Sequence, residues 1–421
     1  MIQRNTFWMI SEENRIVFYL LAAIATLIFI YGFYRRFKLW QKGRREKIKW
    51  SDVKTNAHFF WKMVVQQKKI QIDRLYGVMH RFTSYGFVAL FIGTVLVVID
   101  YDFGVPLLRG NFYLVYKVVL DIFGVLFLAG VLIAIIIRMK KQRLRLWYSI
   151  RDNMLLWLLF IIGVGGFILE GIRIASTKVS YGIWSPIGYT LSRLFQDVSL
   201  FSVDMYVFWW FVHSIFVFVL IAVIPYTKLF HILTAPIQIL MHPVKRTGTI
   251  LLPYDLQTIT DEALLQSPSV LGVNKISDFT NWQLLSTDAC TECGRCDSVC
   301  PAYQSEKPLS PRNVVTKIRN HMHQTYEIST FISPSELQSC TTCGACVEAC
   351  PVSINHIDLI LGMRRGLIQR NILELEAENT LMKVEEQYNI WGKPWSERAN
   401  WSRGLQVPSL DHENVSKSKE A

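Results

Sequence analysis

Long apolar stretches alternate with short polar ones over roughly the first 230 residues of this 421-residue chain. A helix needs about 20 apolar residues to cross the hydrocarbon core of a bilayer, which is about 30 Å thick. Five segments meet this requirement, namely residues 16–33, 78–99, 112–137, 154–174 and 205–226. The pattern therefore predicts an all-α membrane bundle of five transmembrane helices.

Basic residues gather in alternate loops between these spans. The first loop holds Arg35, Arg36, Lys38, Lys42, Arg44, Arg45, Lys47 and Lys49, and the third holds Arg138, Lys140, Lys141, Arg143 and Arg145. Lys and Arg collect in cytoplasmic loops, so we expect a cell-membrane protein with its N-terminus outside and the chain after residue 226 in the cytoplasm. The net charge of +12 then reflects topology rather than nucleic-acid binding.

All eight cysteines lie in two C-x2-C-x2-C-x3-C-P runs after the apolar part. In ferredoxins with two clusters, the fourth cysteine of each run binds the other cluster. This rule assigns one [4Fe-4S] cluster to Cys290, Cys293, Cys296 and Cys350, and the other to Cys340, Cys343, Cys346 and Cys300. Zinc is the weaker alternative, because a structural zinc takes four ligands in spaced pairs.

Three histidines lie in or beside the predicted spans. His213 and His231 are 18 residues apart, which is five helical turns, and His80 matches the depth of His231 at the cytoplasmic edge. We therefore expect His80 and His231 to hold a haem b from two facing helices. His213 lies in the outer half, where the facing level is Leu90; it either binds a second haem or serves a quinone. Pairing of His80 with His213 is a weaker alternative.

Four charged residues are predicted inside the outer half of the membrane. Lys117 and Asp121 lie on one face of the third span, and Glu170 and Arg173 on one face of the fourth. Charges inside a bilayer are costly and mark functional sites, and a quinone needs hydrogen-bond donors and a proton route. We interpret the cluster as a quinone site. The alternative is a set of ion pairs that only holds the bundle together.

The chain is expected to have four parts. Residues 1–240 form the transmembrane cytochrome b domain, 241–279 a cytoplasmic linker, 280–365 a mostly α-helical two-[4Fe-4S] ferredoxin domain, and 366–421 a helical tail with a disordered end. An amphipathic helix is expected at residues 57–76, and a short helix at 311–323. The tail contains Trp391, Trp395 and Trp401 among Lys393, Arg398 and Arg403. Tryptophan and arginine are enriched at interfaces, which favours a partner-docking arm over packing on the ferredoxin domain.

The membrane part resembles the nitrate reductase gamma subunit. The residues that carry this resemblance are His80-Arg81, Leu120-Asp121-Ile122-Phe123-Gly124, Trp209-Trp210 before His213, and Ile224-Pro225-Tyr226-Thr227-Lys228 before His231. The later part contains KISDFTNWQLLSTDACTECGRCDSVCPA, CTTCGACVEACPVSINH and NIWGKPWSERANW. These segments resemble the heterodisulfide-reductase-like family of membrane iron–sulfur oxidoreductases, which includes electron-transfer-flavoprotein:menaquinone oxidoreductases.

The resemblance implies haem b at the matching histidines, a quinone site toward the outer face and two [4Fe-4S] clusters on the cytoplasmic side. Related chains continue past the NIWGKPWSERANW segment into cysteine-rich CCG domains. We therefore expect a separate CCG-domain subunit, like heterodisulfide reductase B or D, to dock on the tail. Electron-transfer flavoprotein is the expected electron donor.

The sequence thus predicts an oxidoreductase subunit that passes electrons from a cytosolic partner through two clusters and haem b to menaquinone or another quinone. Two alternatives remain open at this point. In the first, quinol is oxidised and a disulfide or sulfur substrate is reduced on the partner. In the second, the chain is a membrane redox sensor or scaffold.

Overall fold

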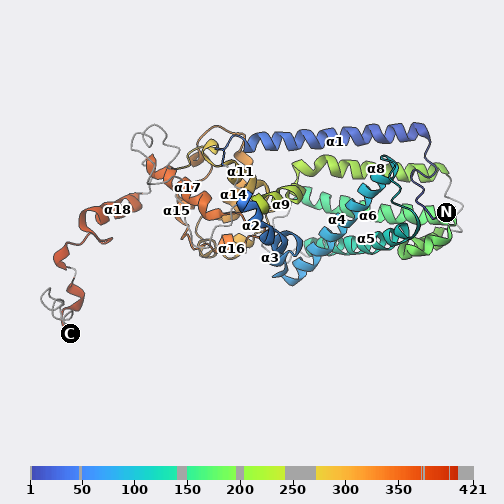
Figure 1. Ribbon diagram of the computed structural model, residues 1–421. Helices are drawn as coiled ribbons and strands as arrows, with labels where there is room; N and C mark the ends of the chain where they lie inside the picture. Colours follow the sequence, from blue (N-terminus) through green and yellow to red (C-terminus); the bar gives the residue numbers. More distant parts are fainter. Residues whose placement is uncertain are drawn as a thin grey trace.

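The computed structural model describes residues 2–46, 50–139, 149–195, 203–241, 272–370, 372, 375–397 and 399–405. Long, roughly parallel helices form a bundle, a smaller helical domain lies at one end of it, and the C-terminal segment extends away from that domain (Figure 1). The loop residues 140–148 and most of the predicted linker, residues 242–271, lie outside the described residues.

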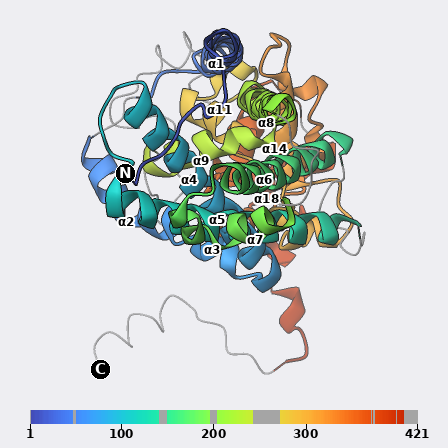
Figure 2. The ribbon, with the colours of Figure 1, turned by 90° about the vertical axis from the view of Figure 1, so that its right-hand side faces the viewer.

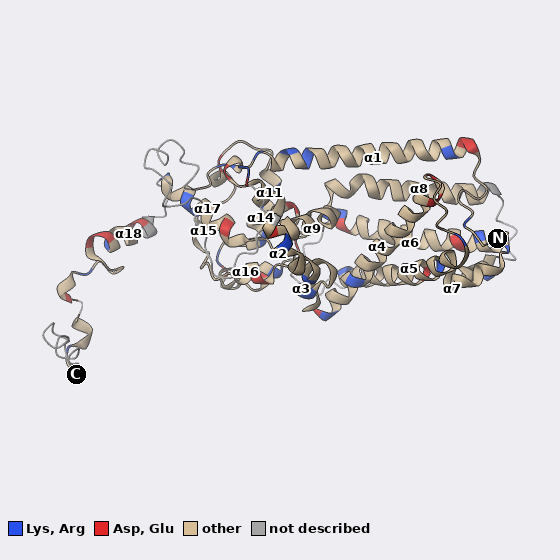
Figure 3. Ribbon diagram, viewed as in Figure 1, with Lys and Arg blue, Asp and Glu red and all other residues tan. Residues whose placement is uncertain are grey.

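The bundle contains the predicted spans. They are α1 (Glu12–Trp40), α4 (Arg74–Tyr101), α5 (Gly110–Met139), α6 (Ile150–Thr177) and α8 (Val203–Val223). Five stretches of helix among the described residues are long and apolar enough to cross a membrane, the last of them running from Met205 to Tyr226 through the short helix η3 (Ile224–Tyr226). The prediction of a five-span all-α bundle is confirmed. Along the middle of these helices charged residues are sparse (Figure 3).

The spans pack in the order α4, α5, α6, α8 and α1, as the end-on view shows (Figure 2). Glycines allow α4 and α5 to approach closely. A β-carbon on Gly86 would lie 2.6 Å from the Phe127 side chain, and one on Gly130 would lie 2.5 Å from the Thr83 hydroxyl. At the end of the bundle far from the small domain, η2 (Ser180–Trp184) and α7 (Pro186–Phe195) fold back against α5 and α6.

Short helices line the end of the bundle nearest the small domain. They are α2 (Trp50–Phe60), the π-helix η1 (Trp61–Val65), α3 (Lys68–Gln71), η4 (Lys228–Phe230) and α9 (His231–Met241). The expectation of one continuous helix over residues 57–76 is wrong. Gln67 has a left-handed backbone with φ of 54°, which ends one helix and redirects the chain before the next.

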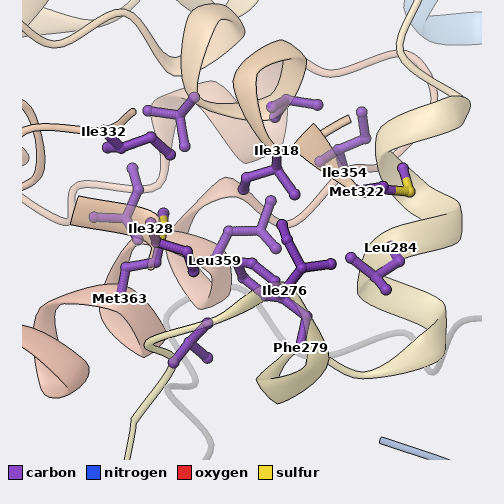
Figure 4. Packing of buried hydrophobic residues seen from close by; sticks show 14 of the residues in the cluster. Ile276, Phe279, Leu284, Ile318, Met322, Ile328, Ile332, Ile354, Leu359 and Met363 are labelled. Atoms are coloured by element: carbon purple, nitrogen blue, oxygen red, sulfur yellow. The ribbon is translucent and has the colours of Figure 1, made fainter. Parts of the chain in front are cut away.

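The small domain is built from short helices around the cysteine runs. They are η6 (Ile276–Asp278), α11 (Asn281–Asp288), α12 (Arg295–Ser298), α13 (Pro301–Gln304), α14 (Pro311–His321), η7 (Ile328–Thr330), α15 (Pro334–Gln338), α16 (Ala345–Ala349) and α17 (His356–Gln369). Its core includes Ile276, Phe279, Leu284, Ile318 and Met322, none more than 1% exposed (Figure 4). The predicted mostly helical cluster domain is confirmed.

The small domain is attached directly to the bundle. The Trp40 indole at the end of α1 donates a 2.7 Å hydrogen bond to Asp288 Oδ2, and the Arg44 amide donates to the Phe279 carbonyl at 2.8 Å. On α9, the Thr234 hydroxyl donates to the Asp288 carbonyl at 3.2 Å. These bonds fix the first cysteine run close to the histidine-bearing end of the bundle.

The tail contains α18 (Leu375–Gln387), η8 (Trp395–Glu397) and η9 (Asn400–Ser402) and leads away from the core (Figure 1). Trp391, Trp395 and Trp401 are 72%, 69% and 71% exposed. The structure therefore does not pack these side chains on the ferredoxin domain, which was the alternative to a docking arm.

Candidate redox cofactor sites

The two cysteine runs fold into matching loops. In each run a glycine after the second cysteine, Gly294 or Gly344, has positive φ (70° and 78°) and begins a short helix, α12 or α16, that carries the third cysteine. These two helices pack against each other. A left-handed glycine at this point turns the chain sharply around a compact group. The local fold suits two cofactors held side by side.

The fourth cysteine of each run lies with the other run. The Cys350 thiol interacts electrostatically with Cys290, Cys293 and Cys296. In the same way Cys300 interacts with Cys340 and Cys346. The fourth cysteine of each run therefore lies near the cysteines of the other run.

Several of the cysteine thiols are buried. Burial raises the pKa of Cys290 to about 12 and that of Cys350 to about 11, so a bound metal would be needed to compensate their ionisation. An iron–sulfur cluster would supply that metal, because each of its iron corners takes its own thiolate.

His80 on α4 and His231 at the start of α9 face each other at the inner end of the bundle. Their ring centroids are 6.4 Å apart and the rings are inclined by 51°. Two imidazoles bound to opposite sides of one metal through bonds of about 2 Å have centroids roughly 6 Å apart. The spacing of this histidine pair therefore suits two axial ligands of one iron.

Hydrogen bonds leave the same ring nitrogen available on both histidines. His80 Nδ1 lies 3.0 Å from Gln67 Oε1, and His231 Nδ1 lies 2.6 Å from the Lys228 carbonyl oxygen. Both oxygens are acceptors, so Nδ1 carries the proton in each ring and Nε2 keeps its lone pair for a metal. Gln67 is itself held by a 2.7 Å bond from its Nε2 to the Ser84 hydroxyl.

The four charged residues predicted in the outer half also come together. Glu170 accepts a 2.7 Å hydrogen bond from Lys117 and further bonds from Arg173. Asp121 instead accepts from the backbone N–H groups of Ile187 (2.8 Å) and Gly188 (3.5 Å) at the start of α7. The carboxylate of Asp121 therefore caps a helix, while Glu170 neutralises two cations.

A small pocket of about 10 Å³ adjoins this cluster. Its lining includes Asn5, Tyr113, Lys117, Arg173, Thr177 and Tyr181. Ser185 donates to Glu170 Oε1 at 3.4 Å, and Tyr113 lines the pocket. The sequence did not single out either residue, because an uncharged side chain is not unusual in a membrane protein. The arrangement places hydrogen-bond donors beside a pocket with room for about one water molecule.

His213 lies apart from the facing pair. Its ring packs on α6, with Nδ1 3.1 Å from the position of a β-carbon on Gly165 and Cε1 3.6 Å from that on Gly166. Nδ1 is buried and has no hydrogen-bond partner among the described residues. The structure therefore does not bring His213 together with His80 or with the charged cluster.

Sequence reasoning missed the residues that join the cofactor sites. Glu292, inside the first cysteine run, forms ion pairs with Arg319 and, at 2.9 Å, with Lys228. Burial opposes ionisation, but these two cations lower the pKa of Glu292. The only sequence signal was that the first run carries charges where the second run has Thr342 and Ala345.

Comparison with protein families divides the chain in the same way. Residues 85–247 match the nitrate reductase gamma subunit family, and residues 286–354 match the 4Fe-4S dicluster domain. EtfAB:quinone oxidoreductase of Syntrophomonas wolfei is 27% identical over 91% of this chain. The probable iron-sulfur-binding oxidoreductase FadF of Bacillus subtilis is 26% identical over 92% of it. The chain is a homologue of these membrane iron–sulfur oxidoreductases.

This homology confirms the resemblance seen in the sequence. One subunit of the dihydromethanophenazine:CoB–CoM heterodisulfide reductase of Methanosarcina mazei is 26% identical over 55% of this chain and 95% of its own length. The chain spans 59% of EtfAB:quinone oxidoreductase and 60% of FadF. No solved structure matches the chain.

Proposed function

We propose that this homologue is an oxidoreductase subunit that passes electrons between a cytosolic partner and the quinone pool through two [4Fe-4S] clusters and haem b. The observation that carries the proposal is the facing pair of His80 and His231, each with Nδ1 in a hydrogen bond and none at Nε2 among the described residues, at the end of the bundle where the cysteine domain is attached. When bound, the clusters and the haem supply one-electron oxidation and reduction.

The protein residues supply ligands and their orientation. Gln67 and the Lys228 carbonyl hold the imidazole rings through Nδ1, which fixes their tautomer and makes them better ligands. Each set has two buried cysteines, but Cys343 of the second set is exposed, whereas Cys290 and Cys293 of the first set are both half-buried. The second cluster would thus be the one that an external partner reaches.

For the quinone we propose the pocket beside Lys117 and Arg173. Both cations can donate to a quinone carbonyl once Glu170 releases one of these bonds, and Glu170 can then hold a proton. Asp121 contributes by holding α7 next to the site. His213 is proposed to serve a second haem or the quinone, because its buried Nδ1 is available.

The partner is proposed to be a CCG-domain subunit fed by electron-transfer flavoprotein, with menaquinone as acceptor. The flavoprotein and a quinone follow from the similarity to EtfAB:quinone oxidoreductase, and a docking arm follows from the exposed tryptophans of the tail. The CCG-domain subunit and menaquinone follow from the resemblance seen in the sequence. The cysteine domain would face the cytoplasm. Reverse flow, from quinol to a disulfide substrate, is the second candidate, because the homology covers 95% of the length of one heterodisulfide reductase subunit.

The test starts from the full chain purified from membranes in mild detergent. We expect b-type absorbance on reduction and two interacting cluster signals by electron paramagnetic resonance. His80→Ala and His231→Ala should each abolish the b-type absorbance, whereas His58→Ala, at an exposed histidine of α2, should retain it. Full absorbance in both site variants would contradict the assignment.

Direction is measured on the same preparation together with the proteins that co-purify with it. Reduced electron-transfer flavoprotein should drive reduction of a menaquinone analogue if electrons flow to quinone. Reduction of the clusters by added quinol, with no flavoprotein-dependent turnover, would favour the second candidate.

A further inference from the structure

The first cysteine run touches the supports of both facing histidines. Glu292 pairs with Lys228 at 2.9 Å, and the carbonyl of Lys228 holds His231 Nδ1 at 2.6 Å. On the other side, Arg295 donates to the carbonyls of Lys69 and, at 2.9 Å, Ile70 in α3. Two charged side chains of one short loop thus reach the two sides of the histidine pair.

The link from Arg295 continues through the short helix α3. This helix begins directly after Gln67, whose Oε1 holds His80 Nδ1 at 3.0 Å. Arg295 binds the carbonyls two and three residues beyond Gln67, so it fixes the segment that carries the His80 support. The path from Cys293 or Cys296 to His80 therefore consists of one side chain and a few residues of backbone.

Glu292 and its partner Lys228 are each held by a further ion pair. Arg319 pairs with Glu292 and also donates to the Cys290 carbonyl at 2.9 Å, so it holds the cysteine loop itself. Lys228 pairs in addition with Asp152 of α6 at 2.7 Å. The chain of contacts runs from the cysteine loop through Glu292 and Lys228 to a membrane helix and to His231.

The second run has the same backbone but no charge at the two matching positions; it reaches α3 through another residue, Glu348, whose exposed carboxylate pairs with Lys69 at 3.4 Å. Thr342, at the position of Glu292, shares its left-handed conformation (φ of 54° against 59°), and Ala345 stands at the position of Arg295. Thr and Ala therefore suffice to form such a loop. The charged pair in the first run must serve something other than the loop fold.

We propose that Glu292 and Arg295 are positioning residues that clamp the first cluster onto the supports of His80 and His231, and so make this cluster the electron partner of the haem. The inference rests on the proposed function. The step served is the movement of one electron between that cluster and the haem iron, with no proton and no bond change. The second cluster, with exposed Cys343, then exchanges electrons with the external partner.

The decisive variant is Glu292→Thr with Arg295→Ala, which gives the first run the residues of the second. Thr342→Ser, at the matching position in the second run, is the control. The full-length protein is reduced with dithionite and mixed with ferricyanide, a hydrophilic oxidant that reaches the exposed cluster first. We expect haem oxidation to be at least tenfold slower in the double variant and unchanged in the control, with both cofactor types retained.

A second variant covers the case in which the double variant loses a cofactor. Glu292→Gln keeps the size of the side chain but removes the charge that faces Lys228 and Arg319. The uncompensated cations should raise the midpoint potential of one cluster, followed by paramagnetic resonance, and leave the other unchanged. A shift of the other cluster, or an equal shift of both, would contradict the placement of Glu292 beside the first cluster.

The outcomes separate the two claims. A wild-type protein without b-type haem or without clusters would refute the proposed function. Normal cofactors and quinone turnover, with an unchanged haem oxidation rate and an unchanged cluster potential in the variants, would refute the clamp alone.

Discussion

The two ends of the bundle differ in how far their polar side chains are already paired. At the inner end, His80 and His231 each use one ring nitrogen for a hydrogen bond and keep the other free. At the outer end, Glu170 already satisfies Lys117 and Arg173. The histidine pair can bind a metal directly, because its ring nitrogens have free lone pairs. In the charged cluster, an ion pair must break before Lys117 or Arg173 can bind a ligand. The two regions therefore call for different experiments.

The largest effect is expected at the outer end, from Glu170→Leu. This change leaves Lys117 and Arg173 buried without their counter-ion, which typically costs about 3–5 kcal/mol. Thermal or denaturant unfolding in detergent would measure it. The control is Glu12→Leu, because Glu12 is 90% exposed in its pair with Arg15 and should cost at most about 1 kcal/mol. Equal stability of the two variants would show that the ion pairs do not hold the bundle.

An intermediate effect is expected at the inner end, from Gln67→Leu. Leucine cannot accept the proton of His80 Nδ1, and loss of such a partner typically weakens metal binding about 10- to 100-fold. Haem titration of the cofactor-depleted protein would measure the loss. Gln66→Leu is the control, since the side-chain oxygen of Gln66 has no hydrogen-bond partner among the described residues. Unaltered haem affinity in Gln67→Leu would mean that His80 is oriented by its helix alone.

The smallest effect is expected from Asp121→Ala. Loss of the carboxylate that caps α7 should cost about 1 kcal/mol and speed hydrogen exchange at the Ile187 and Gly188 amides. Hydrogen exchange with mass spectrometry reads both amides. If quinone turnover falls while these amides stay protected, Asp121 acts on the quinone rather than on α7. The outer cluster would then contain a side chain that is available to bind a ligand, as the inner histidine pair does.

Local patterns were enough to predict the spans and the cysteine sets. Apolar length alone defines a membrane helix, and the spacing of Cys290, Cys293 and Cys296 is a property of one short loop. The assignment of Cys350 to the first set rests on the two copies of the cysteine motif. In ferredoxins with two such runs, the fourth cysteine of each run binds the other cluster. The break at Gln67 was not predictable, because the residue carries no strong turn signal and its left-handed backbone is fixed by contacts made elsewhere.

The sequence by itself therefore determined that the chain has five helices long and apolar enough to span a membrane, and it predicts which cysteines and histidines bind metal. Only the tertiary structure decided that His80 faces His231, that Gln67 and Lys228 support them, and that Glu292 and Arg295 join these supports to the first cysteine run. The physical reason is sequence separation. Spans and cysteine loops depend on neighbours along the chain, whereas Arg295 and Lys69 are 226 residues apart and meet only when the two domains pack.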